Sequence, residues 1–194
     1  MPSRQLVTPT DEALLAVSLD DAKLHLRVDH ADEDDLIVLL IRAAMEDAEA
    51  VMGRALLPQT WRQRLDAWPA GPVELGPASV IAVTAVTSID PDGTPVDLDV
   101  LDEVQLQADD LTARLWPAYG SSWPATRAQP DAVSITYTCG TWGTPAAVPA
   151  LVLAWIKLRI GALYLHREAW TSGKAIERNE HVDGLLDRYR VHRL

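Results

Sequence analysis

The apolar positions in the first quarter of the chain follow a helical period. From Ile37 to Val51 they recur at three- and four-residue spacing, which predicts an amphipathic helix packed against another helix or a sheet. An acidic run beginning at Asp32 suits the first turn, where Asp32 can act as the cap. Gly53 is expected to end this helix, because glycine readily adopts the left-handed backbone conformation of a C-terminal cap. We therefore predict one long helix between Asp32 and Gly53.

A shorter helix is predicted before it. Ser18 stands three residues before Asp21, as in a capping box, and the apolar residues that follow continue the helix to about Arg27. Residues 1–17 contain two prolines and little periodicity. We expect this segment to be an extended arm that becomes ordered only if another segment pairs with it.

From Gln59 the period of the apolar positions changes from near 3.6 to 2, which indicates β structure. Asp90-Pro91-Asp92-Gly93 has the composition of a tight turn and predicts a hairpin. The middle of the chain is thus expected to be an antiparallel unit of five or six strands. The clearest strand candidates are residues 61–67, 80–89, 104–107, 113–116 and 133–139.

The helical period returns from Pro149 to about Arg167. This segment is nearly apolar all round, as in the central helix of a bundle or a helix shared with a neighbouring subunit. A polar loop at 171–180 and a short amphipathic helix at 181–189 complete the chain. The fold class is therefore α+β, a helical core with an inserted antiparallel β unit. We divide it into an N-terminal arm and helices (1–58), the β insertion (59–144), and C-terminal helices and tail (145–194), together one domain.

Charge adds a second constraint. The 194 residues carry 28 acids and 17 bases, a net charge of −11. Residues 1–53 have 12 acids and 4 bases (−8), residues 54–149 have 11 and 5 (−6), and residues 150–194 have 5 and 8 (+3). Such an acidic chain is not expected to bind DNA through counterion release. The basic C-terminal block is suited to an acidic partner or to the acidic half of another copy.

No motif for catalysis, cofactor binding or metal binding is found. The glycines lack the spacing of a phosphate loop, and Cys139 lies in an alternating strand, where a core position is expected. The spacing of His25 and His30 does not place two imidazoles on one helix face. The N-terminus has no apolar signal segment and no stretch is long enough to span a bilayer. We expect a product that stays in the cytoplasm and does not bind membranes.

One loop is rich in aromatic residues. Trp116, Tyr119 and Trp123 fall between two predicted strands, where they could stack on sugars or on a partner protein. The alternative, which we favour, is a long connection held to the β unit by its own rings. In that case Trp116 and Trp123 pack on the unit and Tyr119 is the most exposed of the three. A carbohydrate-binding module remains the alternative function, and a hydrolase using scattered acids is a third.

Several segments together resemble the head-tail connector (adaptor) proteins of long-tailed phages and of phage-derived particles such as gene transfer agents. The similarity runs from about Leu6 to Val191. It is supported by several matching segments that occur in the same order as in the family. The matching segments are residues 19–29, Gly53-Arg54-Ala55-Leu56 with Gln59-Thr60-Trp61, residues 114–124, and residues 185–191.

The resemblance implies a structural virion protein. Its subunits are expected to form a ring, usually of twelve, which binds the portal protein on one side and a tail-side stopper or tail terminator protein on the other. It implies no catalytic residues and no cofactor. A ring of twelve copies at −11 each would carry −132, so an acidic lumen would let DNA pass without binding. A phage, a prophage and a gene transfer agent are all compatible with the sequence.

The portal contact is expected at the C-terminus, where related adaptors commonly bind the portal. The candidates are Arg188, Tyr189, Arg190 and Arg193, because Arg and Tyr are enriched among interface anchors. A frayed terminus is the alternative. Few core positions are expected beyond Leu186, so deletion after Asp187 is expected to spare folding.

Overall fold

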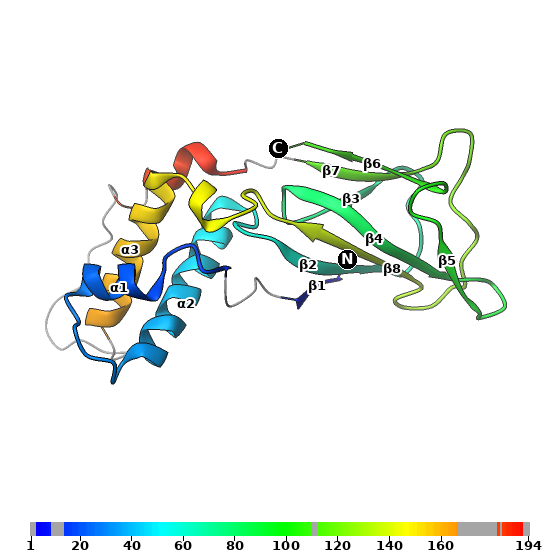
Figure 1. The fold of residues 1–194 in the computed structure, drawn as a ribbon. Coiled ribbons are helices and arrows are strands. Elements are labelled where there is room, and N and C mark those ends of the chain that lie inside the picture. Colours follow the sequence, from blue (N-terminus) through cyan, green and yellow to red (C-terminus); the bar gives the residue numbers. More distant parts are fainter. Residues whose placement is uncertain (1–2, 9–13, 110–111, 167–181, 183, 192–194) are drawn as a thin grey trace, which may run out of the picture. The chain divides into compact units, whose positions relative to one another are not determined.

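The computed structural model describes residues 3–8, 14–109, 112–166, 182 and 184–191 (Figure 1). The chain forms two compact units. The β unit combines Met1–Asp11 with Leu57–Thr141, and the helical unit combines Glu12–Leu56 with Trp142–Leu194. Helices and antiparallel sheets are both present, so the predicted α+β class is confirmed.

The β unit contains two antiparallel sheets. A five-stranded sheet has the order β1-β2-β8-β4-β5, and a three-stranded sheet has the order β3-β7-β6. In its described part the middle of the chain holds seven strands, β2 to β8, rather than the predicted five or six, because the sequence patterns missed the short β3; β1, from the N-terminal arm, is an eighth. The strands are β1 (Ser3–Thr8), β2 (Gln59–Leu65), β3 (Val73–Leu75), β4 (Val80–Ile89), β5 (Pro95–Leu98), β6 (Val104–Ala108), β7 (Ala113–Pro117) and β8 (Val133–Cys139).

Residues 3–8 of the N-terminal arm form a paired strand. β1 lies at the edge of the five-stranded sheet, antiparallel to β2, with Ser3 opposite Arg64 and Leu6 opposite Trp61. All six residues of β1 are exposed, so main-chain hydrogen bonds, rather than burial of side chains, hold the arm. The condition predicted from the sequence, that another segment pairs with the arm, is met by β2.

The turn predicted at residues 90–93 joins β4 to β5. The Asp90 N–H donates to the Thr94 carbonyl at 2.9 Å, and the Thr94 N–H donates to Asp90 Oδ1 at 2.8 Å. Gly93 has φ +93°, a conformation that side chains with a Cβ rarely adopt. The predicted hairpin is therefore confirmed.

β8 is the central strand of the five-stranded sheet and alternates strictly between buried and half-buried positions. Tyr137 and Cys139 are among its buried residues, which confirms the core position predicted for Cys139. The Tyr137 hydroxyl donates to the Gly76 carbonyl. Burial raises the pKa of Tyr137 to about 12.

A buried polar side chain connects the two sheets. Gln63 on β2 is 1% exposed. Its Nε2 donates to the carbonyl of Glu74 on β3 at 2.9 Å, and its Oε1 accepts from Arg4 Nε at 2.7 Å. Because both ends of the amide are paired, Gln63 avoids the cost of burying an unsatisfied polar group. Its bond to Glu74 links a strand of the five-stranded sheet to a strand of the three-stranded sheet.

The helical unit contains three α-helices and two short 3-10 helices in its described part. These are α1 (Leu19–Leu26), α2 (Asp34–Met52), η2 (Pro145–Ala147), α3 (Ala150–Leu165) and η3 (Gly184–Tyr189). Ser18 caps α1 as predicted and accepts the Asp21 N–H at 3.1 Å. Gly53 ends α2 with φ +71°, also as predicted.

Three details of the helices differ from the predictions. The long helix begins at Asp34 with Glu33 at the cap and no side-chain cap bond, so the cap predicted for Asp32 is wrong. Pro149 precedes α3 as its cap instead of lying in its first turn. Of the predicted last helix, residues 184–189 form the 3-10 helix η3 rather than an α-helix. The predicted loop at 171–180 lies outside the described residues.

α2 and α3 pack together to form the core of this unit. Ile37, Ile41 and Ala48 on α2 are fully buried, as are Val152, Ile156 and Ile160 on α3. At the edge of this contact, Arg159 Nε lies 2.6 Å from Asp47 Oδ2. α1 packs against both helices (Figure 1). No helix in the described ranges is long and apolar enough to cross a membrane.

Trp155→Ala tests the core of the helical unit. Trp155 is 4% exposed, so its truncation should lower the free energy of unfolding by about 3 kcal/mol or more. Leu24→Ala is the control, because Leu24 is 79% exposed and its loss should change stability by about 0.5 kcal/mol or less. Chemical denaturation measures both, and equal midpoints for the two variants would contradict the placement of Trp155.

Tyr137→Phe tests the core of the β unit through its pH dependence. Because the folded pKa is raised to about 12, burial of neutral Tyr137 stabilises the fold fully below pH ~10 and less as pH rises toward 12. At pH ~8 the variant should be about 1 kcal/mol less stable, since it lacks the hydrogen bond to Gly76. Denaturation at increasing pH should show the wild-type advantage shrinking above pH ~10. A constant difference would show that Tyr137 is not buried in its neutral form.

Candidate functional site

The C-terminal segment is anchored to the helical unit by one buried side chain and one backbone bond. Leu186 in η3 is fully buried, and η3 contacts both α2 and α3. Beyond η3, the Val191 N–H donates to the carbonyl of Met52, the last residue of α2, at 2.8 Å. The C-terminal segment is therefore packed against the helical unit as far as residue 191.

Aromatic and charged contacts fix the residues between these two anchors. The Tyr189 ring meets Trp142 edge to face, with centroids 6.0 Å apart and an interplanar angle of 78°. Arg190 Nη1 pairs with Asp187 Oδ1 at 3.1 Å. None of the residues described beyond Leu186 belongs to the buried core, as expected, but Tyr189, Arg190 and Val191 are half-buried by these contacts.

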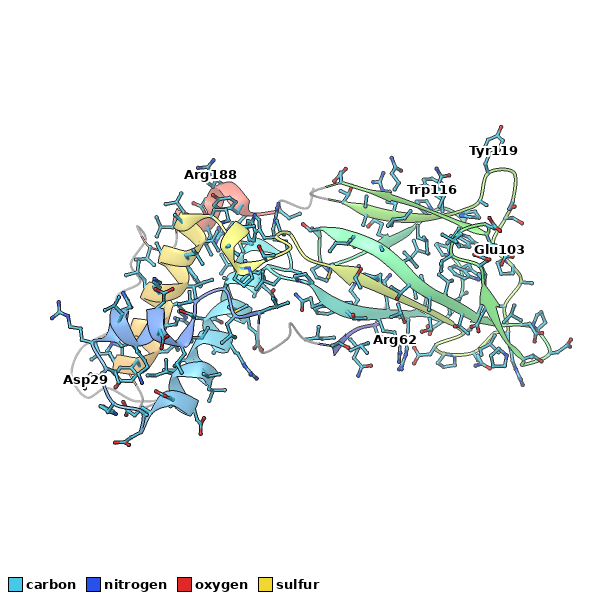
Figure 2. The ribbon with its side chains drawn as sticks, viewed as in Figure 1. Asp29, Arg62, Glu103, Trp116, Tyr119 and Arg188 are labelled. Carbon is cyan, nitrogen blue, oxygen red and sulfur yellow. The ribbon has the colours of Figure 1, made fainter. Side chains whose placement is uncertain are left out.

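The four predicted portal-binding residues therefore differ in what they offer a partner. Arg188 is exposed, and its guanidinium carbon lies 5.3 Å from the centre of the Tyr189 ring. Figure 2 shows it on the outer side of η3. Tyr189 and Arg190 are half-buried in contacts within the unit, and Arg193 lies outside the described residues. Arg188 is thus a cation that the fold holds in place at the surface.

The aromatic loop follows β7 and has a different construction. Trp123 stacks on Trp68, with ring centroids 4.1 Å apart and an interplanar angle of 3°. Its Nε1 donates to the Gly71 carbonyl at 3.1 Å. Trp116 is 38% exposed, and its Nε1 donates to Gln107 Oε1 at 3.3 Å. As predicted, the ring of Trp123 holds the loop on the β unit; Trp116 instead lies within β7, and its ring is partly exposed.

Tyr119 is the most exposed of the three rings, as predicted. It is fully exposed and projects from the tip of the loop (Figure 2). Beside the loop lies a shallow hollow of about 420 Å³, which Trp116, Tyr119 and Trp123 help to line. One face of Trp123 is covered by Trp68 and both indole N–H groups are bonded within the protein. These rings are therefore poorly placed to bind a sugar between them.

Sequence reasoning missed the partners of both aromatic sites. Trp68 and Trp123 are 55 positions apart, and Trp142 and Tyr189 are 47 apart. Neither pair belongs to a local periodic pattern, so only the folded chain brings them together. Within the described ranges, no group of three or more His, Cys, Asp or Glu side chains is placed to hold a metal ion.

Comparison with known proteins gives one family match. Residues 16–90 match the phage gp6-like head-tail connector protein family. This segment spans α1, α2 and the strands β2 to β4. No match was found among curated proteins.

Three solved structures resemble nearly the whole chain. One, from the neck of an empty gene transfer agent particle computed with C6 symmetry, shares 25% identity at a TM-score of 0.80 and covers 99% of this chain and 97% of its own. A chain from the virion of a native gene transfer agent particle shares 23% identity (TM-score 0.78, 98% and 96% coverage). A chain from a native neck computed with C12 symmetry shares 21% identity (TM-score 0.77, 99% and 97% coverage). The resemblance to head-tail connector proteins inferred from the sequence is confirmed.

Variants of the aromatic loop test whether its rings are structural. Trp123→Ala removes the stack on Trp68 and the bond to Gly71, so it should lower the free energy of unfolding by about 2–4 kcal/mol. Tyr119→Ala is the matched control, and its effect should stay within about 0.5 kcal/mol. Thermal denaturation measures both. A stable Trp123→Ala variant that has lost affinity for a glycan would instead support a carbohydrate site.

Proposed function

We propose that this chain is a non-enzymatic subunit of a head-tail connector ring in a tailed phage or a phage-like particle such as a gene transfer agent. The observation that carries the proposal is the match over 99% of the chain to a neck protein of a gene transfer agent particle at a TM-score of 0.80. The connector family match at residues 16–90 supports it independently, because it rests on sequence. The segments 1–58, 59–144 and 145–194 would work as one domain, in which the β segment is an insertion.

The ring would lie between the portal protein and a tail-side stopper or tail terminator protein. Twelve copies are the expected number, and the C12 symmetry of one similar neck agrees with it. DNA would pass through the lumen without sequence-specific binding, because the net charge of −11 per copy repels phosphates. Assembly would take place in the bacterial cytoplasm.

The C-terminal segment is the proposed portal contact. η3 presents Arg188 at the surface, while Leu186, Tyr189 and Val191 hold the segment on the helical unit. A cation held in this way loses little side-chain freedom when a partner binds, which favours affinity. An acidic surface on the portal would match it, because opposite charges steer association and fix its register.

Carbohydrate binding by the aromatic loop is not favoured. A sugar site needs exposed ring faces and free hydrogen-bond donors, whereas Trp123 is stacked on Trp68 and its N–H is bonded to Gly71. Tyr119 alone offers a fully exposed ring. The loop is a structural connection whose tip is free for contact with another neck component.

Arg188→Ala tests the portal contact. The substitution keeps the η3 anchors and should leave the melting temperature nearly unchanged, because Arg188 is exposed. Attachment of the protein to portal-containing heads should fall on the order of tenfold or more, the effect of losing about 1.4 kcal/mol of binding energy. Electron microscopy of mixed heads and protein counts the attached necks.

Arg127→Ala, at an exposed arginine of the β unit, is the matched control and should attach normally. Attachment of Arg188→Ala at the wild-type level would move the portal contact away from η3. Deletion after Asp187 is a poorer test, because it also removes the contacts of Tyr189 with Trp142 and of Val191 with Met52.

A further inference from the structure

α3 carries a line of exposed apolar side chains. Three of the leucines of α3 belong to it: Leu151, Leu158 and Leu165 are 39%, 43% and 76% exposed. Spacings of three and four residues place the whole set on one side of the helix, over about 21 Å. We call this line the α3 stripe; it consists of Leu151, Ala154, Leu158, Ala162 and Leu165.

Among the described residues of the helical unit, none covers this stripe, and its members are exposed. The fully buried residues Val152, Ile156 and Ile160 face α2 and the rest of the unit from another side of α3. A continuous line of exposed leucines on a folded helix is typical of a protein interface. The stripe therefore needs a partner with an apolar surface of its own.

α2 carries a second exposed line with a different character. The α2 stripe combines two apolar residues with two acids, and it lies opposite the buried residues Ile37, Ile41 and Ala48. The leucine of this stripe, Leu39, is 62% exposed. Its members are Asp35, Leu39, Glu46 and Ala50.

The two helices are complementary in charge. The charged residues of α3 are Lys157 and Arg159, which flank the stripe and pair with Asp21 and Asp47 of the same unit at 3.6 and 2.6 Å. α2 has five acids and one arginine, a formal charge of −4, and the acids of its stripe take no part in these two pairs. Contact between the α3 stripes of two copies would bring like charges together. Contact between an α3 stripe and an α2 stripe would bring opposite charges to the borders of an apolar seam.

We propose that the α3 stripe of one copy binds the α2 stripe of the next copy, and that this contact builds the ring. The proposal rests on the proposed function, because a ring with rotational symmetry needs two unlike surfaces on each subunit. Leu39 and Leu158 provide the apolar centre of the seam. The acids of the α2 stripe lie toward the cationic borders of α3.

Cysteine cross-linking in assembled necks tests this pairing. Cys139, the one native cysteine, is fully buried and should not react. Leu158→Cys is combined in turn with Leu39→Cys, Glu46→Cys or Ala50→Cys, which covers the length of the α2 stripe. A short bifunctional maleimide should give a ladder of three or more linked chains with at least one of these pairs. Each single variant should remain monomeric on a denaturing gel.

Controls separate the possible failures. Leu158→Cys paired with Leu24→Cys, on exposed α1, should give no ladder. Dimers from Leu158→Cys alone would show contact between like stripes and overturn the proposal. Rings without a ladder from any α2 pair would overturn it while leaving the connector function intact. If the wild-type chain formed no ring on portal-containing heads, the proposed function itself would fail.

A charge variant gives a second readout. Leu158→Glu places an acid in the α3 stripe opposite the acids of the α2 stripe, so ring formation should fall at least tenfold although the monomer remains folded. Leu24→Glu is the control and should assemble normally. Normal rings from Leu158→Glu would overturn the proposal.

Discussion

The packing of α2 against α3 is the contact on which the rest of the structure depends. The two helices lie on either side of the inserted β segment in the sequence, so the helical unit exists only if they find each other. Fully buried residues on both helices and the ion pair of Asp47 with Arg159 hold them together. η3 then binds to the surface that this pair creates. Loss of the α2–α3 contact would therefore also release the segment that presents Arg188.

Much of the fold was predictable because it rests on local periodicity. The strict alternation at residues 133–139 and the spacing along α2 identify these elements from the sequence alone. The partner of β1 and the short β3 were missed, because strand pairing depends on distant residues. The stack of Trp68 on Trp123 and the contact of Tyr189 with Trp142 were missed for the same reason. Arg188 and Tyr119 can be named as candidates from the sequence, but only the structure shows that Tyr189 anchors the segment from which Arg188 projects.

The proposed function depends on surfaces rather than on reactive groups. Buried aromatic and polar contacts fix the shapes of the two units, as Gln63 and Tyr137 do in the β unit. The groups that would contact partners are exposed: Arg188 on η3, Tyr119 at the tip of the aromatic loop, and the α3 stripe. Such a division suits a protein that assembles with copies of itself and with other neck components, since rigid surfaces lose little entropy on binding.

Electron microscopy of particles that contain this protein tests the central claim most directly. Image averaging of their necks should show a ring of this chain between head and tail, with a rotational symmetry and with the helical unit of each copy in contact with the next. Particles in which the protein is absent from the neck, or in which heads and tails join normally without it, would contradict the account.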